Sequence, residues 1–455
     1  MKDIYAYIDA HADEFIADLQ TFVRQPSVSA QNIGLRDCAE LVRRMMHDDG
    51  LPAEFHELKE GPPVVFGHLP SPASPKTILC YSHYDVQPPE PIEAWTHGGP
   101  WSATIVNDVM YGRGATDNKS GVLAFNKAAK SFLAVRGHVP VGLKFLIEGE
   151  EEIGSPNLGE WAARNKDMLK AEGMHCLDGS LEIGADVPDV SLGLKSVLFA
   201  ELIARGPRED VHSLNFPLVA NPVWDLVHAL GTIMDRNRKI LIEDWAEGIY
   251  VPDAEHEGFL ADKVARTDFD EMKRDLGVKD FVLGRQGVYA LRARTYEPTA
   301  NIQGIIAGYT GPGTKTIVPK EARVRLDFRL IPNIQPDVAA RKLKDHLKKH
   351  GFDSIEVKTF DHAEPPYKIS ASEDIAQAII AAAHEVYGAP PIVNGVSAEG
   401  AILKHVWIPC VLTGFANPGC NLHAPDENIH IDKYIKGIKY AAAIMEHFGR
   451  TGESL

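Results

Sequence analysis

The chain has 455 residues, more than one ordinary hydrophobic core accommodates, so two domains are expected. Hydrophobic residues make up 44% of it and charged residues 24%, as in a water-soluble globular protein. The formal net charge of −16 argues against a nucleic-acid-binding protein, because binding the phosphate backbone requires a basic face.

An amphipathic helical segment is predicted near the N-terminus. Ile8, Phe15, Leu19 and Phe22 fall on one helical face, and Pro26 follows. Acidic residues interrupt this segment, which excludes a secretory signal peptide, and no apolar run in the chain reaches the length of a membrane span. The five cysteines are scattered without a CxxC pair, so no disulfide framework is expected and the predicted location is the cytoplasm.

The first 195 residues alternate between apolar strands and helices. Strands are expected at 77–82, 141–147 and 174–177, with a helix at 120–135. Continuous apolar strands separated by helices are typical of a buried, mostly parallel sheet.

The pattern changes near residue 198. Alternating strands are expected at 289–297 and 322–332 and helices at 221–237 and 336–351, around a charged excursion at 237–285. The first pattern then returns, so a second, α+β domain is expected to be inserted into a discontinuous first domain. The expected segments are residues 1–197 and 363–455 for the first domain and 198–362 for the inserted domain.

Acidic and histidine side chains follow the expected strands. They are His83 and Asp85 in YSHYDVQP, Asp117 in GRGATDNKSG, Glu151 and Glu152 in LIEGEEEIGS, Asp178 in HCLDGS, and His423 in GCNLHAPDENI. In open α/β sheets ligands bind outside the carboxyl ends of the strands, so these loops are expected to converge. Each signal alone is weak, but together they offer two imidazoles and three carboxylates, which suit two divalent ions sharing one bridging carboxylate. Asp117 is the best bridge because glycines flank it.

These motifs, in this order and spacing, resemble those of the dizinc exopeptidase family of carnosine dipeptidases, aminoacylase-1, succinyl-diaminopimelate desuccinylase and glutamate carboxypeptidase. The resemblance covers nearly the whole chain, and the long excursion is similar to the carnosinase-like dipeptidase branch. It implies an α/β fold: a zinc-exopeptidase-like catalytic domain with a mostly parallel sheet, and an inserted α+β (ferredoxin-like) lid and dimerisation domain.

The resemblance also implies roles for the clustered residues. His83 and Asp178 would hold one metal ion, Glu152 and His423 the other, and Asp117 would bridge the two. The ions are expected to be zinc, although the same ligands accept manganese or cobalt.

Two further residues are expected to act beside these ligands. Asp85 would hold the imidazole of His83 by its remaining N–H. Glu151 would act as general base, taking a proton from the attacking water and passing it to the leaving amine. The family also suggests a cis peptide between Asp117 and Asn118.

The inserted domain carries candidate substrate residues. DVHSLNFPLVANP resembles the family's DxHSG segment, which implies that His212 donates to the developing oxyanion from the neighbouring subunit of a homodimer. Leu214 stands where the family has glycine. Arg329 is the candidate grip for a substrate carboxylate, with Thr316 and Asn301 as polar contacts.

NGVSAEGAILKHVWIP departs from the family, which has a GGSIP-type segment there. Glu399 in this stretch would repel a carboxylate and attract an amine, so it is expected to face the substrate.

The predicted function is a cytoplasmic dizinc metallopeptidase that hydrolyses dipeptides or closely related short peptides, acting as a homodimer through its lid without nucleic acid or membrane. The alternative is an amidohydrolase of the same fold that removes the acyl group from an N-acyl amino acid or another small amide. A third possibility is an inactive relative with a binding or regulatory role, which the presence of all five ligands and Glu151 disfavours.

Overall fold

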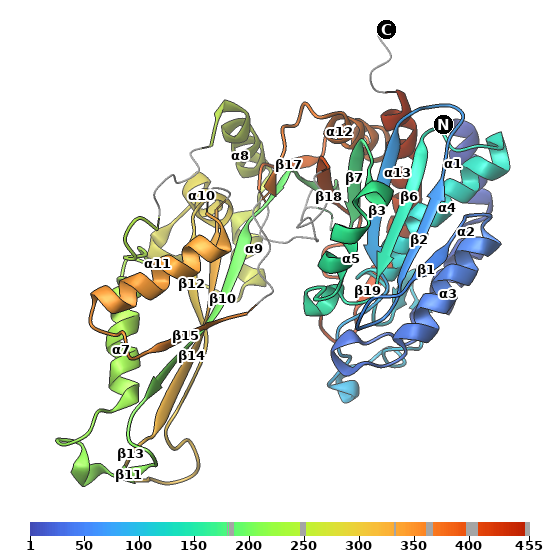
Figure 1. Ribbon diagram of the computed structural model, residues 1–455. Helices are drawn as coiled ribbons and strands as arrows, with labels where there is room; N and C mark the ends of the chain where they lie inside the picture. The colour runs from blue at the N-terminus through green and yellow to red at the C-terminus, as the bar shows by residue number, and fades with distance from the viewer. Residues whose placement is uncertain are drawn as a thin grey trace.

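The computed structural model describes residues 1–179, 181, 186–245, 252–331, 334–360, 367–396 and 408–450. Within these residues the chain forms two main β-sheets, which lie at opposite sides of Figure 1. The larger sheet has the order β1-β2-β6-β3-β7-β18-β8-β17. Its strands are β1 (Glu54–His56), β2 (Val64–Leu69), β3 (Thr77–His83), β6 (Gly142–Glu148), β7 (Gly173–Leu177), β8 (Asp189–Ser191), β17 (Ile392–Asn394) and β18 (Cys410–Thr413).

The adjacent strands β6, β3, β7 and β18 are parallel. His83 at the end of β3 pairs with Glu148 of β6, and Leu177 at the end of β7 pairs with Thr413 of β18. The carboxyl ends of these strands therefore meet along one edge of the sheet. The strands expected at 77–82, 141–147 and 174–177 are confirmed to within one residue at each end.

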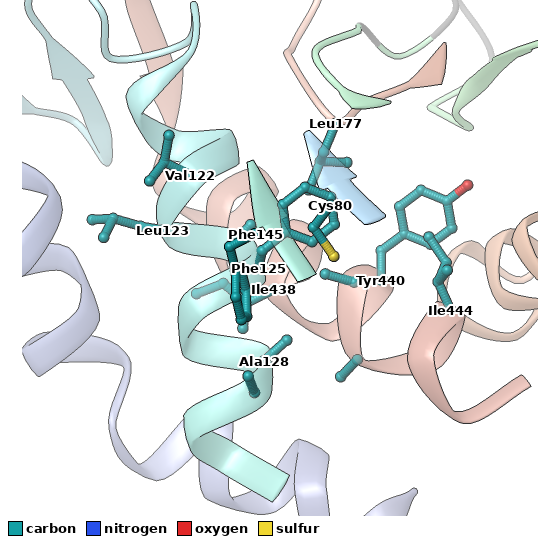
Figure 2. Close-up of a cluster of buried hydrophobic side chains, with 14 of the residues drawn as sticks. Cys80, Val122, Leu123, Phe125, Ala128, Phe145, Leu177, Ile438, Tyr440 and Ile444 are labelled. Atoms are coloured by element: carbon teal, nitrogen blue, oxygen red, sulfur yellow. The ribbon is translucent and has the colours of Figure 1, made fainter. Parts of the chain in front are cut away.

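Helices cover both faces of the large sheet because alternate residues of each strand are apolar on opposite sides. Cys80 and Phe145 face one side and pack against helices, as Figure 2 shows with Phe125 and Tyr440, whereas Tyr81 faces the other. The first side packs against α1 (Lys2–Ala10), α2 (Ala12–Arg24), α3 (Leu35–Asp48), α4 (Lys119–Arg136), α12 (Asp374–Tyr387) and α13 (Ile431–Arg450), and the second against α5 (Leu158–Arg164) and α6 (Lys166–Leu169). The N-terminal segment forms two helices, α1 and α2, separated at His11.

The smaller sheet is antiparallel, with the order β12-β14-β10-β15. Two helices pack their apolar sides against its core. The elements are β10 (Ser196–Arg205), α7 (Pro222–Ile233), β12 (Thr299–Ala307), β14 (Glu321–Leu330), α11 (Pro336–Lys349) and β15 (Glu356–Thr359). Apart from the excursion, this is the β-α-β-β-α-β order of a ferredoxin-like unit, as expected. The exact domain boundaries at 197/198 and 362/363 stay a prediction.

The strand expected at 289–297 is wrong, because these residues form the helix α10 (Val288–Tyr296). Alternation of Leu291 and Ala293 with arginines matches a strand, but alanine, leucine and arginine are also good helix formers. Packing decides between the two: Leu291 and Tyr296 are buried against Leu260 of α8 (Ala254–Arg266). The strand forms just after this helix, as β12.

Helix α8 connects the excursion to the large sheet. The Lys263 side chain of α8 donates to the Asn394 side chain of β17 at 2.9 Å and lies 3.3 Å from the Asp189 carboxylate of β8. The remaining described elements are β4 (Thr104–Val106), β5 (Val109–Tyr111), β9 (Gly193–Leu194), β11 (Val211–His212), β13 (Ile317–Val318), β16 (Tyr367–Lys368), β19 (Asn428–His430), α9 (Phe269–Asp275), η1 (Ser29–Gln31), η2 (Ile92–Ala94), η3 (Glu151–Ile153), η4 (Ser213–Asn215) and η5 (Val282–Gly284). In the described part of the chain, none of the helices combines the length and the hydropathy of a membrane span.

Candidate metal centre and active site

Four parallel strands deliver the predicted residues to one edge of the large sheet. His83 is the last residue of β3, Asp178 follows β7 directly, and Glu151 and Glu152 lie in η3 just after β6. His423 lies in a turn after β18 and has a left-handed backbone with φ of 58°. Asp117 comes from the turn before α4, and the Asp117–Asn118 peptide is cis, as expected.

His83, Asp117 and Asp178 form the first group. The Nε2 atom of His83 lies 3.1 Å from Oδ1 of Asp117 and 3.3 Å from Oδ2 of Asp178. His83 is buried, and among the described residues its Nε2 has no hydrogen-bond partner. An imidazole nitrogen that is buried, unpaired and surrounded by carboxylate oxygens is an arrangement suited to a divalent cation.

Asp117, Glu152 and His423 form the second group. The Nε2 atom of His423 lies 3.0 Å from Oδ2 of Asp117 and 3.4 Å from Oε2 of Glu152. Asp117 therefore turns one carboxylate oxygen toward each histidine. In each group the candidate ligand atoms lie within 4.8 Å of one another, so the residues fit two ions sharing Asp117.

The electrostatics of the cluster also favour cations. Burial, reinforced by neighbouring carboxylates, raises the pKa of Glu151 to about 8 and that of Glu152 to about 10. Burial alone would raise the pKa of Asp117, but its contacts with His423 and His83 hold it below the usual range. Glu151 and Glu152 therefore hold protons more tightly than free carboxyl groups do, and a bound divalent ion reverses that tendency.

Asp85 orients several neighbours at once. Its carboxylate oxygens accept the backbone N–H of Glu151 at 3.1 Å and of Glu152 at 3.0 Å. The Nδ1 atom of His83 contacts the Asp85 main-chain carbonyl at 3.1 Å and lies 3.4 Å from the Asp85 carboxylate. Asp85 thus contacts His83 through its main chain as well as its side chain, and it also anchors the backbone of both glutamates.

Gln87 is a site residue that the sequence analysis missed. Its side-chain amide donates to Oε2 of Glu152 at 2.8 Å and to the Glu152 carbonyl at 3.3 Å. It lies in the same YSHYDVQP motif as His83 and Asp85, but a neutral amide carries no signal of its own in a search for charged ligands.

A cavity of about 370 Å³ opens beside the two groups. Asp117, Glu151 and His423 line it together with apolar residues. Glu151 belongs to neither group of candidate ligands, and its Oε2 lies 4.0 Å from Nε2 of His83. The apolar part of the lining consists of Leu177, Leu412, Phe415, Ala416 and Leu422.

The candidate residues of the inserted domain are not among the described residues that line this cavity. His212 and Thr316 lie together, since the Ser213 N–H donates to the Thr316 carbonyl at 3.0 Å. They belong to the region of β11 and β13, at the end of the smaller sheet farthest from the larger one (Figure 1).

Asn301 and Arg329 lie on the smaller sheet. The Asn301 side chain of β12 donates to Oδ1 of Asp327 at 2.9 Å. Arg329 lies near the end of β14, opposite Val197 and Thr299. Glu399 lies outside the described residues.

Comparison with known proteins agrees with this geometry. A model of peptidase family M20/M25/M40 matches residues 79–447. An M20 family metallo-carboxypeptidase, Sso-CP2 from Sulfolobus solfataricus, has a crystal structure with a TM-score of 0.89 and 36% sequence identity, covering 96% of this chain and 99% of its own.

Two curated dipeptidases are similar over nearly their whole length. Human Beta-Ala-His dipeptidase is 28% identical over 97% of this chain and 92% of its own, and the Cys-Gly metallodipeptidase dug1 of Schizosaccharomyces pombe is 29% identical over 96% of both. The family resemblance is thereby confirmed. The chain belongs to peptidase family M20/M25/M40 and is a hydrolase of the metallopeptidase class.

Proposed function

We propose that this protein hydrolyses the amide bond of dipeptides or closely related short peptides, using two divalent metal ions. The observation that carries the proposal is that the two carboxylate oxygens of Asp117 lie beside two different imidazoles, those of His83 and His423. Glu151 belongs to neither ligand group. His83 and Asp178 would hold one ion and Glu152 and His423 the other. The chemistry that such a pair of ions supplies is polarisation of the scissile carbonyl and activation of water.

Glu151 is proposed to move the proton. Its backbone is anchored by Asp85 and its side chain reaches the cavity, so it can accept a proton from the attacking water and donate it to the leaving amine. Burial raises the pKa of Glu151 in the metal-free protein, and two bound cations would lower it again, which favours the ionised form that accepts a proton from water.

A homodimer formed through the inserted domain is also proposed. Among the described residues β12 pairs with β14 alone, which leaves its other edge open, and Ile305 and Ile306 are 55% and 70% exposed. Exposed apolar side chains on an open edge strand are typical of a surface that another chain covers. We further propose that His212 of one copy reaches the cavity of its partner in this dimer.

We propose that His212 donates a hydrogen bond from its Nε2–H group. Its Nδ1 accepts the N–H of Leu214 at 3.1 Å, so the neutral ring carries its proton on Nε2. This contact forms although Leu214 replaces the family's glycine. An N–H aimed at the developing oxyanion stabilises the transition state.

The similarity to two relatives named as dipeptidases supports short peptides as the substrates of this protein. Arg329 is our candidate for binding the carboxylate of such a peptide. The five cysteines are buried free thiols, which is consistent with a reducing cytoplasm. Removal of an acyl group from N-acyl amino acids stays the alternative, and the similarity to Sso-CP2 adds carboxypeptidase action on longer peptides to the reactions worth testing.

The test is amine release from metal-loaded protein over dipeptides, tripeptides, longer peptides and N-acyl amino acids, with and without chelator. Chelator-sensitive cleavage of dipeptides, restored by zinc, manganese or cobalt, is expected. Cleavage of N-acyl compounds alone would establish the alternative, and trimming of longer peptides alone would establish a carboxypeptidase. No cleavage of any substrate would contradict the proposal.

A further inference from the structure

The Glu427 carboxylate lies at the junction between the two chain segments that carry Asp117 and His423. Glu427 is fully buried, although it lies only four residues after the half-exposed His423. The Nη1 atom of Arg113, itself buried, donates to its Oε2 at 2.6 Å.

The same carboxylate accepts three backbone N–H groups from the turn that contains Asp117. Gly114 donates to Oε2 at 3.0 Å, Thr116 to Oε1 at 3.0 Å and Asp117 to Oε1 at 3.1 Å. A buried carboxylate with a guanidinium and three amide donors is satisfied as an anion, and hydrogen bonds to an ionised acceptor are the strong ones.

Further bonds connect the two segments around this point. The Gly112 N–H donates to the Glu427 carbonyl at 2.9 Å, and the Thr116 hydroxyl donates to the Asn428 carbonyl at 2.7 Å. The backbone of Asp117 and the turn that carries His423 are thus held in one hydrogen-bonded unit. The distance between these two side chains follows from that unit.

We propose that Glu427 is the positioning residue of the metal centre: it sets the spacing of Asp117 and His423 and so determines how tightly the ion between them is bound. The inference rests on the proposed function, because it presumes that these two residues bind a metal ion. A purely structural role for Glu427, as the ion-pair partner of Arg113, would predict a change in folding stability with unchanged metal affinity. The positioning role predicts a change in metal affinity.

The test compares Glu427→Gln with a matched variant, Glu446→Gln. Glu446 is also buried and accepts a bond from an arginine, Arg136, at 2.7 Å. Arg136 ends the helix α4 that begins at Lys119 beside the site, so the control lies at the opposite end of that helix. Zinc affinity of each chelator-treated protein is measured by competition with a chromophoric chelator, and thermal unfolding of the same metal-free samples is measured by circular dichroism.

Glu427→Gln is expected to weaken the binding of at least one zinc ion by about 10- to 100-fold, as loss of a group that orients metal ligands does. Glu446→Gln is expected to lower the unfolding temperature and to keep wild-type zinc affinity. Wild-type affinity in a folded Glu427→Gln protein would overturn the inference. Equal loss of affinity in both variants would also overturn it, because the effect would then be general destabilisation.

A second variant covers the case in which Glu427→Gln does not fold. Glu427→Asp keeps the negative charge but shortens the side chain by one methylene, so the carboxylate cannot hold all four donors at once, and zinc binding is expected to weaken by about 2- to 10-fold. Unchanged affinity in this variant would overturn the inference. If the wild-type protein binds no divalent ion, the proposed function itself is overturned. If the wild type and the variants bind zinc equally well, only the inference about Glu427 is overturned.

Discussion

At the scale of single residues, the acidic run at 148–152 divides into separate tasks. Glu148 accepts the Tyr81 hydroxyl at 2.7 Å, and Glu150 accepts the Asn157 amide at 2.9 Å, so both are bound within the fold. Glu151 and Glu152 instead line the cavity. Neighbouring carboxylates of one sequence run therefore have different partners, and only the latter two are available for chemistry.

Replacing Glu151 by glutamine tests this division. Glu151→Gln is expected to lower kcat by about 10²- to 10⁴-fold, because the amide cannot accept the proton, while zinc stoichiometry stays at the wild-type value. Glu150→Gln is the matched control and is expected to keep most of the activity, since its side chain bonds Asn157 and does not line the cavity. Full hydrolytic activity in Glu151→Gln would contradict the general-base assignment.

His175 on β7 is predicted to make the protein sensitive to acid. It is fully buried beside Phe125, with ring centroids 5.1 Å apart, and burial lowers its pKa to about 3. The unfolded chain, in which histidine has a pKa near 6.5, therefore binds more protons below that pH, so stability falls as the pH decreases from about 6.5 toward 3. From pH 7 to pH 5 this loss amounts to about 2 kcal/mol.

The measurement is urea unfolding of the wild type and of His175→Leu at pH 7 and pH 5. The variant is expected to lose about 2 kcal/mol less of its unfolding free energy than the wild type between these pH values. Equal losses in the two proteins would show that other groups cause the acid sensitivity.

At the scale of elements, the turns after β7 and β18 approach each other closely. The Asp178 N–H donates to the Thr413 carbonyl at 3.0 Å, and a Cβ added to Gly414 would lie 1.8 Å from the Gly179 carbonyl oxygen. Only glycine fits at position 414 without displacing this turn. The contact therefore holds Asp178 in place beside His83.

Gly414→Ala is expected to destabilise the protein by about 1–3 kcal/mol through overpacking, and to weaken zinc binding because the Asp178 turn must move. Gly231→Ala in α7 is the control: a Cβ there meets no atom within 4 Å, and alanine in a helix is expected to add about 0.5–1 kcal/mol of stability. The free energy of unfolding of both variants is measured in urea, and their zinc affinity by titration. Unchanged zinc affinity in Gly414→Ala would show that this contact does not position Asp178 for metal binding.

At the scale of the whole molecule, His212 and the proposed metal centre lie far apart within one chain. Figure 1 shows β11 at the far end of the smaller sheet, away from the strand ends that carry the clustered ligands. A role for His212 in catalysis therefore requires a second copy of the chain, and the exposed β12 edge is the proposed contact.

Ile306→Asp places a charge on that edge and is expected to give a folded monomer in sedimentation, with activity lowered because His212 no longer reaches a partner's cavity. Leu276→Asp, at a leucine that is 60% exposed just after α9, is the control and is expected to stay dimeric and active. A dimer that persists in Ile306→Asp would place the interface elsewhere, and a fully active monomer would remove the role of His212 in the partner's site.

The sequence by itself determined the fold class and the residues that gather at the strand ends. Short, mostly apolar runs such as residues 141–147 favour buried strands, and the residues that follow parallel strands meet at one edge of the sheet. For residues 289–297 the sequence alone did not decide between a helix and a strand, because these residues suit both structures locally. Contact with Leu260 of α8 settled it.

Only the tertiary structure decided how the site is held together. The hydrogen bond from Gln87 to Glu152 joins residues 65 positions apart, and those from two backbone amides to the Asp85 carboxylate join residues 66 and 67 positions apart. Glu427 contacts the Asp117 turn across 310 positions. Such hydrogen bonds leave no periodic pattern in the sequence, because they depend on which loops the folded sheet brings side by side.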